Sequence, residues 1–172
     1  MQNQPIVHLI SADEAQGKTK ELFTQMEKST GQVPKWMRVM ANCPDTLSGF
    51  LALFKSVMDD APTDQLLKWK VAYVVSQLNK CDFCVDVTRM KLKQLGLDEQ
   101  SMKNIEKACG EKECVAIEYA KAVTTHAYKI SPEIIEKLKQ HFTDQQIVEI
   151  TSVVGLFNFI NRFNDALRIL PE

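Results

Sequence analysis

The sequence has almost no excess of charge of either sign and no long apolar run. Its 172 residues carry 21 Lys and Arg against 22 Asp and Glu, a formal net charge of -1. Binding to nucleic-acid phosphates needs a basic surface, so we expect no nucleic-acid partner. No stretch of about 18 apolar residues appears, so we expect no membrane span. The first residues lack a basic start followed by a long apolar core, which argues against a signal peptide and favours a cytoplasmic protein.

Cysteine and histidine are also scarce. The chain has five Cys and three His. An odd number of cysteines without a signal peptide is not typical of a secreted disulfide framework. We therefore expect thiols in a reducing cytoplasm, and interpret Cys43, Cys109 and Cys114 as loop or packing cysteines.

The apolar residues recur at helical spacing nearly throughout, and the sequence lacks strand-like alternation and internal repeats. We predict an all-α fold of about eight or nine helices. It forms a single domain over residues 1–172, with residues 1–33 as an N-terminal helical extension. The predicted helices cover 11–28, 35–41, a segment after Asp45, 64–78, one capped by Asn79 and ending at Gly96, 98–108, 113–128, 132–141 and 143–169.

The segment Cys81-Asp82-Phe83-Cys84 is the strongest chemical signal. A spacing of three at a helix start places both sulfurs on one helix face. The helix start and Lys80 both favour a thiolate, which is the form that attacks a peroxide or a disulfide. The second thiol then resolves a sulfenic acid into a disulfide. We expect this link to form on mild oxidation before any link that involves Cys109 or Cys114.

Two other interpretations remain for these residue types. Cys81, Cys84, Cys109 and Cys114 together could bind zinc, but structural zinc is typical of tight turns in core-poor modules, and the first pair lies in a strong helical pattern. We expect no metal and no cofactor. His126 is a candidate base with a pKa near neutrality, although a single helical histidine is more often structural or solvated.

Three stretches resemble the AhpD-like and carboxymuconolactone decarboxylase family. The first runs from Val71 to Cys84 and combines an apolar helix, an asparagine and Cys-x-aromatic-Cys. The second runs from Ala41, just before the Asn-x-Pro turn, to Phe54. The third is in the C-terminal helix and comprises 147–150 with Asn158, Asn161, Arg162 and Asp165. Together they cover about residues 34–168, in the family's order.

The resemblance implies an AhpD-like helical bundle that assembles into homo-oligomers of three or six subunits. It also implies a cytoplasmic antioxidant that reduces hydroperoxides, with a lipoyl or thioredoxin-like electron donor. In such proteins the second cysteine attacks and the first resolves, which corresponds to Cys84 and Cys81. The local electrostatics favours Cys81 as the attacking thiolate instead, because Cys81 lies closer to the helix start and to Lys80.

The sequence departs from the family at the proton relay. The family's histidine, four residues after the second cysteine, is Thr88 here, and its glutamate, twelve residues before the first, is Trp69. General acid–base help is worth about 10²- to 10⁴-fold, so peroxidase activity should be weak unless Asp82, Asp86 or His126 substitutes. We expect a thiol-dependent antioxidant that reduces hydroperoxides or disulfides. The alternatives are a relay-deficient oligomer that binds small molecules, or a carboxymuconolactone decarboxylase-like lyase.

Overall fold

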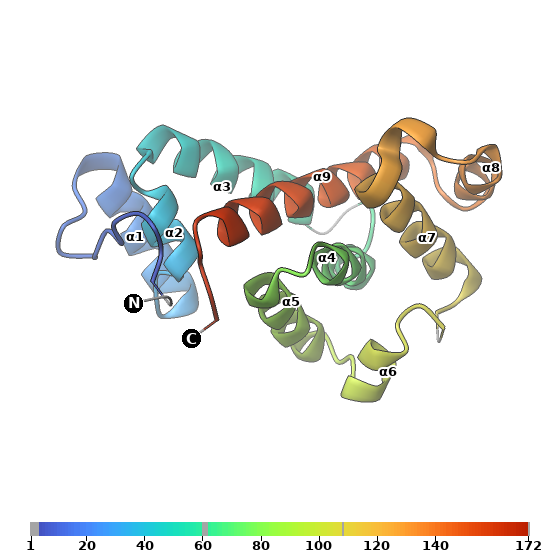
Figure 1. Cartoon of the computed structure of the whole chain (residues 1–172), viewed down its shortest axis with the longest axis horizontal. Helices are drawn as coiled ribbons and strands as arrows, with labels where there is room; N and C mark the ends of the chain where they lie inside the picture. Colours follow the sequence, from blue (N-terminus) through green and yellow to red (C-terminus); the bar gives the residue numbers. More distant parts are fainter. Residues whose placement is uncertain (1–3, 60–61, 108, 172) are drawn as a thin grey trace. The chain divides into compact units, whose positions relative to one another are not determined.

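The computed structural model describes residues 4–59, 62–107 and 109–171. In these ranges every regular element is a helix, which confirms the predicted all-α class (Figure 1). The elements are α1 (Gly17–Thr30), α2 (Lys35–Met40), α3 (Pro44–Met58), α4 (Gln65–Asn79), α5 (Asp82–Gln94), α6 (Glu99–Lys103), α7 (Glu111–His126), the 3₁₀ turn η1 (Ala127–Lys129), α8 (Pro132–His141) and α9 (Asp144–Ala166). Among the residues described, no helix has the length and apolarity that crossing a membrane requires.

The chain divides into two compact units. The first comprises residues 4–56 and Asn164–Leu170, and the second comprises Val57–Phe163 and Pro171, apart from the residues not described. The predicted single domain with residues 1–33 as an extension stays a prediction. The segment before α1 and α1 itself belong to the first unit.

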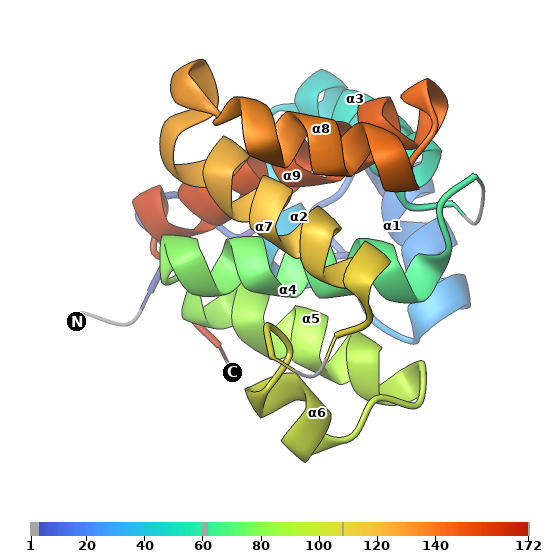
Figure 2. The same ribbon diagram turned by 90° about the vertical axis from the view of Figure 1, so that its right-hand side faces the viewer.

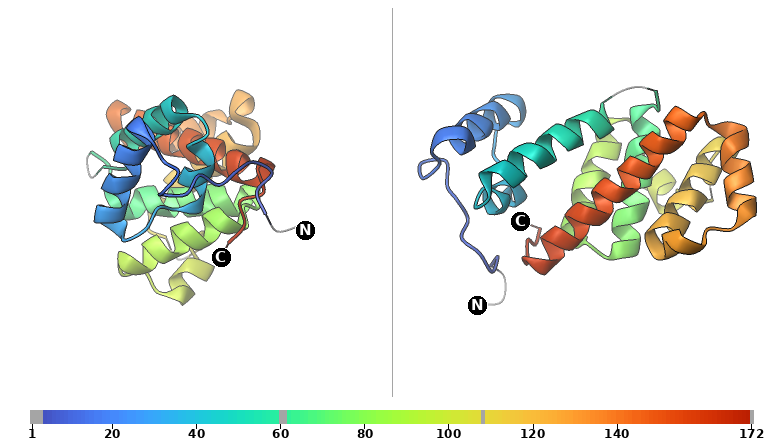
Figure 3. Two further views of the ribbon diagram at one scale, coloured as in Figure 1. Left: turned by 90° about the vertical axis from the view of Figure 1, so that its left-hand side faces the viewer. Right: turned by 90° about the horizontal axis from the view of Figure 1, so that it is seen from above.

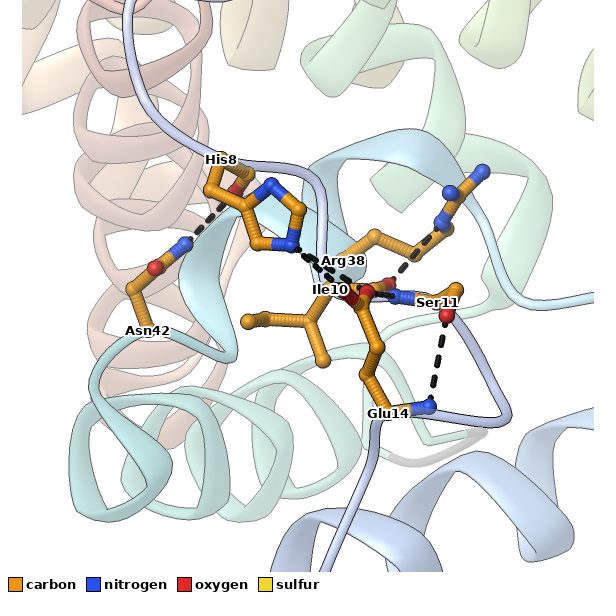
Figure 4. A network of polar contacts seen from close by, with 6 residues as sticks. All are labelled: His8, Ile10, Ser11, Glu14, Arg38 and Asn42. Atoms are coloured by element: carbon orange, nitrogen blue, oxygen red, sulfur yellow. Dashed lines mark hydrogen bonds and ion pairs between the residues drawn. The ribbon is translucent and has the colours of Figure 1, made fainter.

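In the first unit, polar contacts fasten the N-terminal segment to α2 and the residues that follow it (Figure 4). Ile10 and Arg38 are joined twice, by Ile10 N donating to Arg38 O at 3.2 Å and by Arg38 Nε donating to Ile10 O at 3.1 Å. Asn42 Nδ2 donates to His8 O at 2.8 Å. Met37 and Leu47 pack in the core beneath, each 0% exposed. The segment before α1 is thus an ordered part of its unit.

The capping box at Ser11 forms, but it closes a single turn instead of starting the predicted helix. Ser11 N donates to the Glu14 carboxylate at 2.7 Å, and Glu14 N donates to Ser11 Oγ at 3.3 Å. The backbone bond from Ser11 holds the pKa of Glu14 below its usual value. Gly17 has φ of 49°, in the left-handed region, so the helix cannot run through it from Ser11. The predicted start at Ser11 is therefore wrong, and α1 begins at Gly17.

In the second unit, α4 is the central helix. Every residue from Leu67 to Ser76 is buried, so this helix needs neighbours on all sides. α5 and α7 pack on opposite sides of α4 (Figure 2), and α8 packs against α7 (Figure 3). α9 also reaches α4, through a hydrogen bond of 3.2 Å from Asn161 Nδ2 to Ser76 Oγ.

Three predicted helix starts are confirmed by their caps. Asp64, Asp98 and Ser131 each accept a hydrogen bond from the backbone N–H three residues on, at 2.9, 2.8 and 3.4 Å. Some ends differ. α6 ends at Lys103 instead of near residue 108, which lies outside the described residues, and α9 ends at Ala166 because Arg168 turns left-handed, with φ of 57°.

Candidate functional site

The turn between α4 and α5 sets the position of the dithiol. Lys80 is left-handed, with φ of 58° and ψ of 33°. Its N–H donates to Gln77 O at 3.1 Å, and the N–H of Cys81 donates to Ser76 O at 3.2 Å. This is a Schellman pattern, which ends a helix and satisfies two of its last carbonyls. Helix α5 follows at once, with Cys81 as its N-cap.

Cys81, not Asn79, caps α5, so the predicted cap is wrong. Cys81 has the extended backbone of an N-cap, with φ of -85° and ψ of 94°, but its side chain makes no capping hydrogen bond. The amide of Asn79 is engaged on α9 instead, where it donates to Oδ1 of Asn158 at 3.0 Å and of Asn161 at 2.9 Å. The side chain that the local sequence predicted to cap α5 makes a tertiary contact instead.

Cys81 and Cys84 hold the N-cap and third helical positions of α5. Both are thiols and both are buried, with 0% and 4% exposed. Side chains at these two positions face each other across the first turn, as they do in a capping box. The first-turn N–H groups have no intrahelical acceptor, so the positive end of the helix dipole favours a thiolate here, against the effect of burial.

A buried amide network connects this turn to α9. Asn161 is 0% exposed; it accepts from Asn79 and donates to Ser76 Oγ. Arg162 Nη1 donates to Oδ1 of Asn158 at 2.6 Å and so extends the network to the surface. The sequence showed Asn158 and Asn161 on one helix face, but it did not predict that they hold the residue two before Cys81.

Thr88 lies one helical turn after Cys84 and is 0% exposed. Its hydroxyl donates to Cys84 O at 2.7 Å and lies 3.1 Å from Val85 O. The hydroxyl proton is therefore committed to the backbone of its own helix, so Thr88 supplies no proton to a leaving group.

Trp69 fills the position of the family's glutamate as a packing residue. It is 8% exposed, and its ring meets Phe157 edge-on with centroids 5.9 Å apart. Lys91 Nζ lies 6.0 Å from the Trp69 ring centroid, at the limit of a cation–π contact. The indole anchors α4 against α9.

The three remaining candidates are at the surface. Asp82, in the first turn of α5, and Asp86 are both exposed. His126 ends α7, is also exposed, and has Nδ1 at 2.7 Å from Thr125 Oγ1. None of them has the buried environment that the sulfurs have, and their part in a proton relay stays a prediction.

The other cysteines differ from the expectation. Cys109 and Cys114 form a disulfide, so their assignment as loop or packing thiols is wrong, while Cys43 is an exposed thiol. Cys81 and Cys84 are thiols in the same structure, and the order in which the two pairs oxidise stays a prediction. Their disulfide leaves no thiolate for zinc at these positions, and within the described ranges no cluster of three or more His, Cys, Asp or Glu could hold a metal.

Two buried lysines on α4 were not predicted. Lys68 and Lys70 are 1% and 8% exposed. Lys68 Nζ bonds Glu149 at 2.8 Å and also the carbonyl of Asp59, and Lys70 Nζ bonds Glu113 at 2.7 Å. These pairs neutralise charges that the helix buries. The sequence did contain a sign of these buried pairs, since the two lysines stand within an otherwise apolar run.

Comparison with known proteins gives distant relatives. No family model matches the chain. It is 29% identical over 114 residues to the uncharacterized protein YnjA of Escherichia coli K12. The match covers 63% of this chain and 63% of YnjA, so the chain spans less than two thirds of that relative's length.

Solved structures match over nearly the whole chain. An uncharacterized peroxidase-related protein from Silicibacter sp. TM1040 superposes with a TM-score of 0.88 at 26% identity, covering 98% of this chain and 92% of that one. An uncharacterized peroxidase-related protein from Ralstonia eutropha JMP134, described as an alkylhydroperoxidase AhpD core, gives 0.83 at 18% identity, covering 99% and 92%. The debrominase Bmp8, in complex with 2,3,4-tribromopyrrole, gives 0.76 at 21% identity, covering 97% and 89%. The last two likenesses, at their level of identity, concern the fold.

Proposed function

We propose that this chain, which has the AhpD-like fold, is a dithiol oxidoreductase whose Cys81 and Cys84 reduce hydroperoxides or disulfides. The observation that carries the proposal is the placement of both thiols in the first turn of α5, at the N-cap and third positions. This turn combines a helix dipole that favours a thiolate with a second thiol in reach of the first.

The reaction with a hydroperoxide has two steps. The Cys84 thiolate attacks the terminal peroxide oxygen, the O–O bond breaks, the alcohol leaves, and Cys84 becomes a sulfenic acid. The Cys81 thiol then displaces water and forms the Cys81–Cys84 disulfide. We assign the attack to Cys84, which holds the position of the attacking cysteine in the family that the sequence resembles. A lipoyl or thioredoxin-like dithiol returns the two electrons and restores both thiols.

The missing relay determines which substrates react fast. A departing alkoxide or hydroxide needs a proton, since water has a pKa of about 15.7. A departing thiolate needs none at neutral pH when its pKa is at or below the usual value of about 8.5. Thr88 and Trp69 cannot supply the proton, so we propose that disulfides are reduced faster than hydroperoxides. Both sulfurs are buried, so either substrate reaches them only after a local opening.

The shared fold supports a second candidate, the reductive removal of halogen from a small aromatic ring. A thiolate takes the halogen, the ring carbon takes a proton, and the second thiol displaces halide from sulfur. The products are the dehalogenated ring, halide and the disulfide. Halide leaves sulfur without protonation, and the fold is shared with a debrominase.

The test is a turnover assay with dihydrolipoamide as electron donor and cumene hydroperoxide, an aromatic disulfide or a brominated pyrrole as substrate. Cys81→Ser and Cys84→Ser should each lower turnover by at least about 100-fold. Cys43→Ser is the matched control, because Cys43 is an exposed thiol outside the pair, and it should retain full activity. Full activity in both Cys81→Ser and Cys84→Ser would remove the dithiol from the mechanism.

A further inference from the structure

We propose that Cys109 and Cys114 form a second, reversible redox site, which external dithiols open and which fixes the first turn of α7. The disulfide joins the residue before the α7 N-cap, Gly110, to a residue of that helix's first turn, with Cα atoms 5.4 Å apart. The site goes beyond the proposed dithiol chemistry and does not depend on it.

The two cysteine pairs lie at opposite ends of α4. Glu113, next to Cys114, bonds Lys70 in the first half of α4, whereas Cys81 follows the end of that helix. At 1.5 Å of rise per residue, Lys70 and Cys81 are separated by roughly 15 Å along the helix axis. Direct exchange between the pairs is therefore out of reach, and an external dithiol must reduce the second pair.

An external dithiol reaches Cys109 and Cys114 more easily than it reaches Cys81 and Cys84, because they are more exposed. Cys109 and Cys114 are both half-buried, whereas Cys81 and Cys84 are 0% and 4% exposed. The cysteines are only five residues apart in the sequence, and a disulfide that closes so short a loop constrains the unfolded chain little. The fold therefore does not depend on this link. In this it differs from a small secreted scaffold, which depends on its disulfides for stability.

The structure also offers each sulfur an acceptor for the reduced state. Cys114 Sγ lies 3.3 Å from Cys109 O, and Cys109 Sγ lies 3.5 Å from Glu106 O. A disulfide sulfur has no proton to donate, whereas a thiol donates weakly to a carbonyl. Reduction gives each sulfur a proton, and a carbonyl oxygen lies near each one to accept a hydrogen bond from it after the side chains rotate apart.

Contacts on both sides keep the two thiols in reach of each other after reduction. Glu106 bonds Lys121 Nζ at 2.6 Å, and Glu113 bonds Lys70 Nζ at 2.7 Å. Val115, the residue after Cys114, is 6% exposed and belongs to the core. These anchors allow the link to re-form, which distinguishes a reversible site from a structural disulfide.

An external dithiol reduces the Cys109–Cys114 link by thiol–disulfide exchange. A donor thiolate attacks Cys109 Sγ, the bond between the two protein sulfurs breaks, and the Cys114 thiolate leaves. It leaves at the start of α7, where the helix dipole stabilises it. The donor's second thiol then attacks the mixed disulfide and releases Cys109. Two electrons and two protons pass from the donor to the protein, and the donor becomes a disulfide.

Opening the link should loosen the turn that it fixes. Glu111, Lys112 and Glu113 lie between the two cysteines and form the first residues of α7. Helix ends fray when they lose an anchor. We expect trypsin to cut after Lys112 several-fold faster in the reduced protein, while the melting temperature falls by less than about 10 °C.

The experiment equilibrates the folded chain with dihydrolipoamide and lipoamide at graded ratios, followed by alkylation, peptide mapping and timed trypsin cleavage. It uses the wild type, the double variant Cys81→Ser/Cys84→Ser, and Cys109→Ser/Cys114→Ser. The Cys109–Cys114 link should open and close reversibly in the first two, with equal midpoints, because the site acts alone. Cys109→Ser/Cys114→Ser should show the fast cleavage after Lys112 at every ratio, and Cys43→Ser should match the wild type.

Three results would overturn the proposal. The first is a native chain without the Cys109–Cys114 link under air. The second is a link that resists excess dihydrolipoamide until the protein unfolds, which would make it structural. The third is cleavage after Lys112 that does not change on reduction. A midpoint that shifts in Cys81→Ser/Cys84→Ser would contradict the independence of the two sites, whereas loss of turnover in that variant bears on the proposed function alone.

Discussion

The side-chain amide of Asn79 donates a hydrogen bond of 2.9 Å to Oδ1 of Asn161, across 82 residues of sequence. Asn161 in turn donates to Ser76 Oγ at 3.2 Å, and Ser76 O accepts from the N–H of Cys81. One buried amide therefore holds both sides of the turn that places the first cysteine. The dithiol depends on α9 as much as on its own helix.

Replacing Asn161 should weaken this turn. In Asn161→Ala the half-buried amide of Asn79 loses a partner and the buried Ser76 Oγ loses its donor, which should lower the free energy of unfolding by about 1–3 kcal/mol. The alkylation rates of Cys81 and Cys84 in the folded protein should rise, because local opening becomes easier. Urea unfolding and timed alkylation measure the two effects. Gln77→Ala, at an exposed position of α4, is the control and should change neither.

Removing one partner of the buried Lys68–Glu149 pair should lower the free energy of unfolding more than removing both partners. The Lys68 side chain is 0% exposed and that of Glu149 is 11% exposed. Lys68→Met leaves the Glu149 carboxylate without its cationic partner, with only the N–H of Thr63 to bond it, and should lower the free energy of unfolding by about 3–5 kcal/mol. The double variant Lys68→Met/Glu149→Leu should recover most of this loss. Equal stability of the single and double variants, measured by urea unfolding, would show that the pair is not coupled.

The Glu99 carboxylate should give a pH-dependent contribution to stability. Arg89 and Lys93 bond it and hold its pKa at about 2, below the usual 4.5. Because the pKa is lower in the folded state, the stabilisation is present above pH 4.5 and is lost as the pH falls towards 2. Glu99→Gln should therefore lower the melting temperature at pH 7 and have little effect near pH 2. Glu118→Gln, an exposed glutamate on α7, is the control, and the same pH trend there would mean a general acid effect.

The homo-oligomer expected from the sequence stays a prediction, and α9 suggests where its interface lies. Val148 and Phe159 are 66% and 48% exposed, and their spacing of eleven residues, three helical turns, places them on one face. Light scattering of the wild type should give three or six times the mass of one chain. Val148→Glu/Phe159→Glu should give monomers, whereas the control Tyr128→Glu, at a 90% exposed position, should not. A monomeric wild type at micromolar concentration would contradict the prediction.

The sequence predicted most helices because their starts are local. Asp64, Asp98 and Ser131 cap the helices that their neighbours form, and each bond spans three residues. The predictions were wrong where a longer-range contact or a special backbone angle decided the outcome. The local sequence predicts Asn79 as a helix cap, but its side chain bonds α9 instead. The Ser11 capping box predicts a helix start, but the left-handed Gly17 prevents a helix from running on from it.

The candidate site was predictable only as a pair of residues. The spacing of Cys81 and Cys84 indicated a shared helix start, which the structure has at α5. Their burial could not be predicted, because it comes from residues far away in the chain. The Cys109–Cys114 link was missed for a related reason, since a spacing of five across a helix start does not show whether the sulfurs meet.

The most direct measurement of the dithiol chemistry starts from fully reduced protein and adds one equivalent of cumene hydroperoxide. Samples are quenched by alkylation over time, and the first disulfide to form is identified by peptide mapping. The account predicts that two thiols are consumed per peroxide, that the first link joins Cys81 to Cys84, and that Cys81→Ser accumulates a sulfenic acid at Cys84. A first link between Cys109 and Cys114, with Cys81 and Cys84 still thiols, would contradict it.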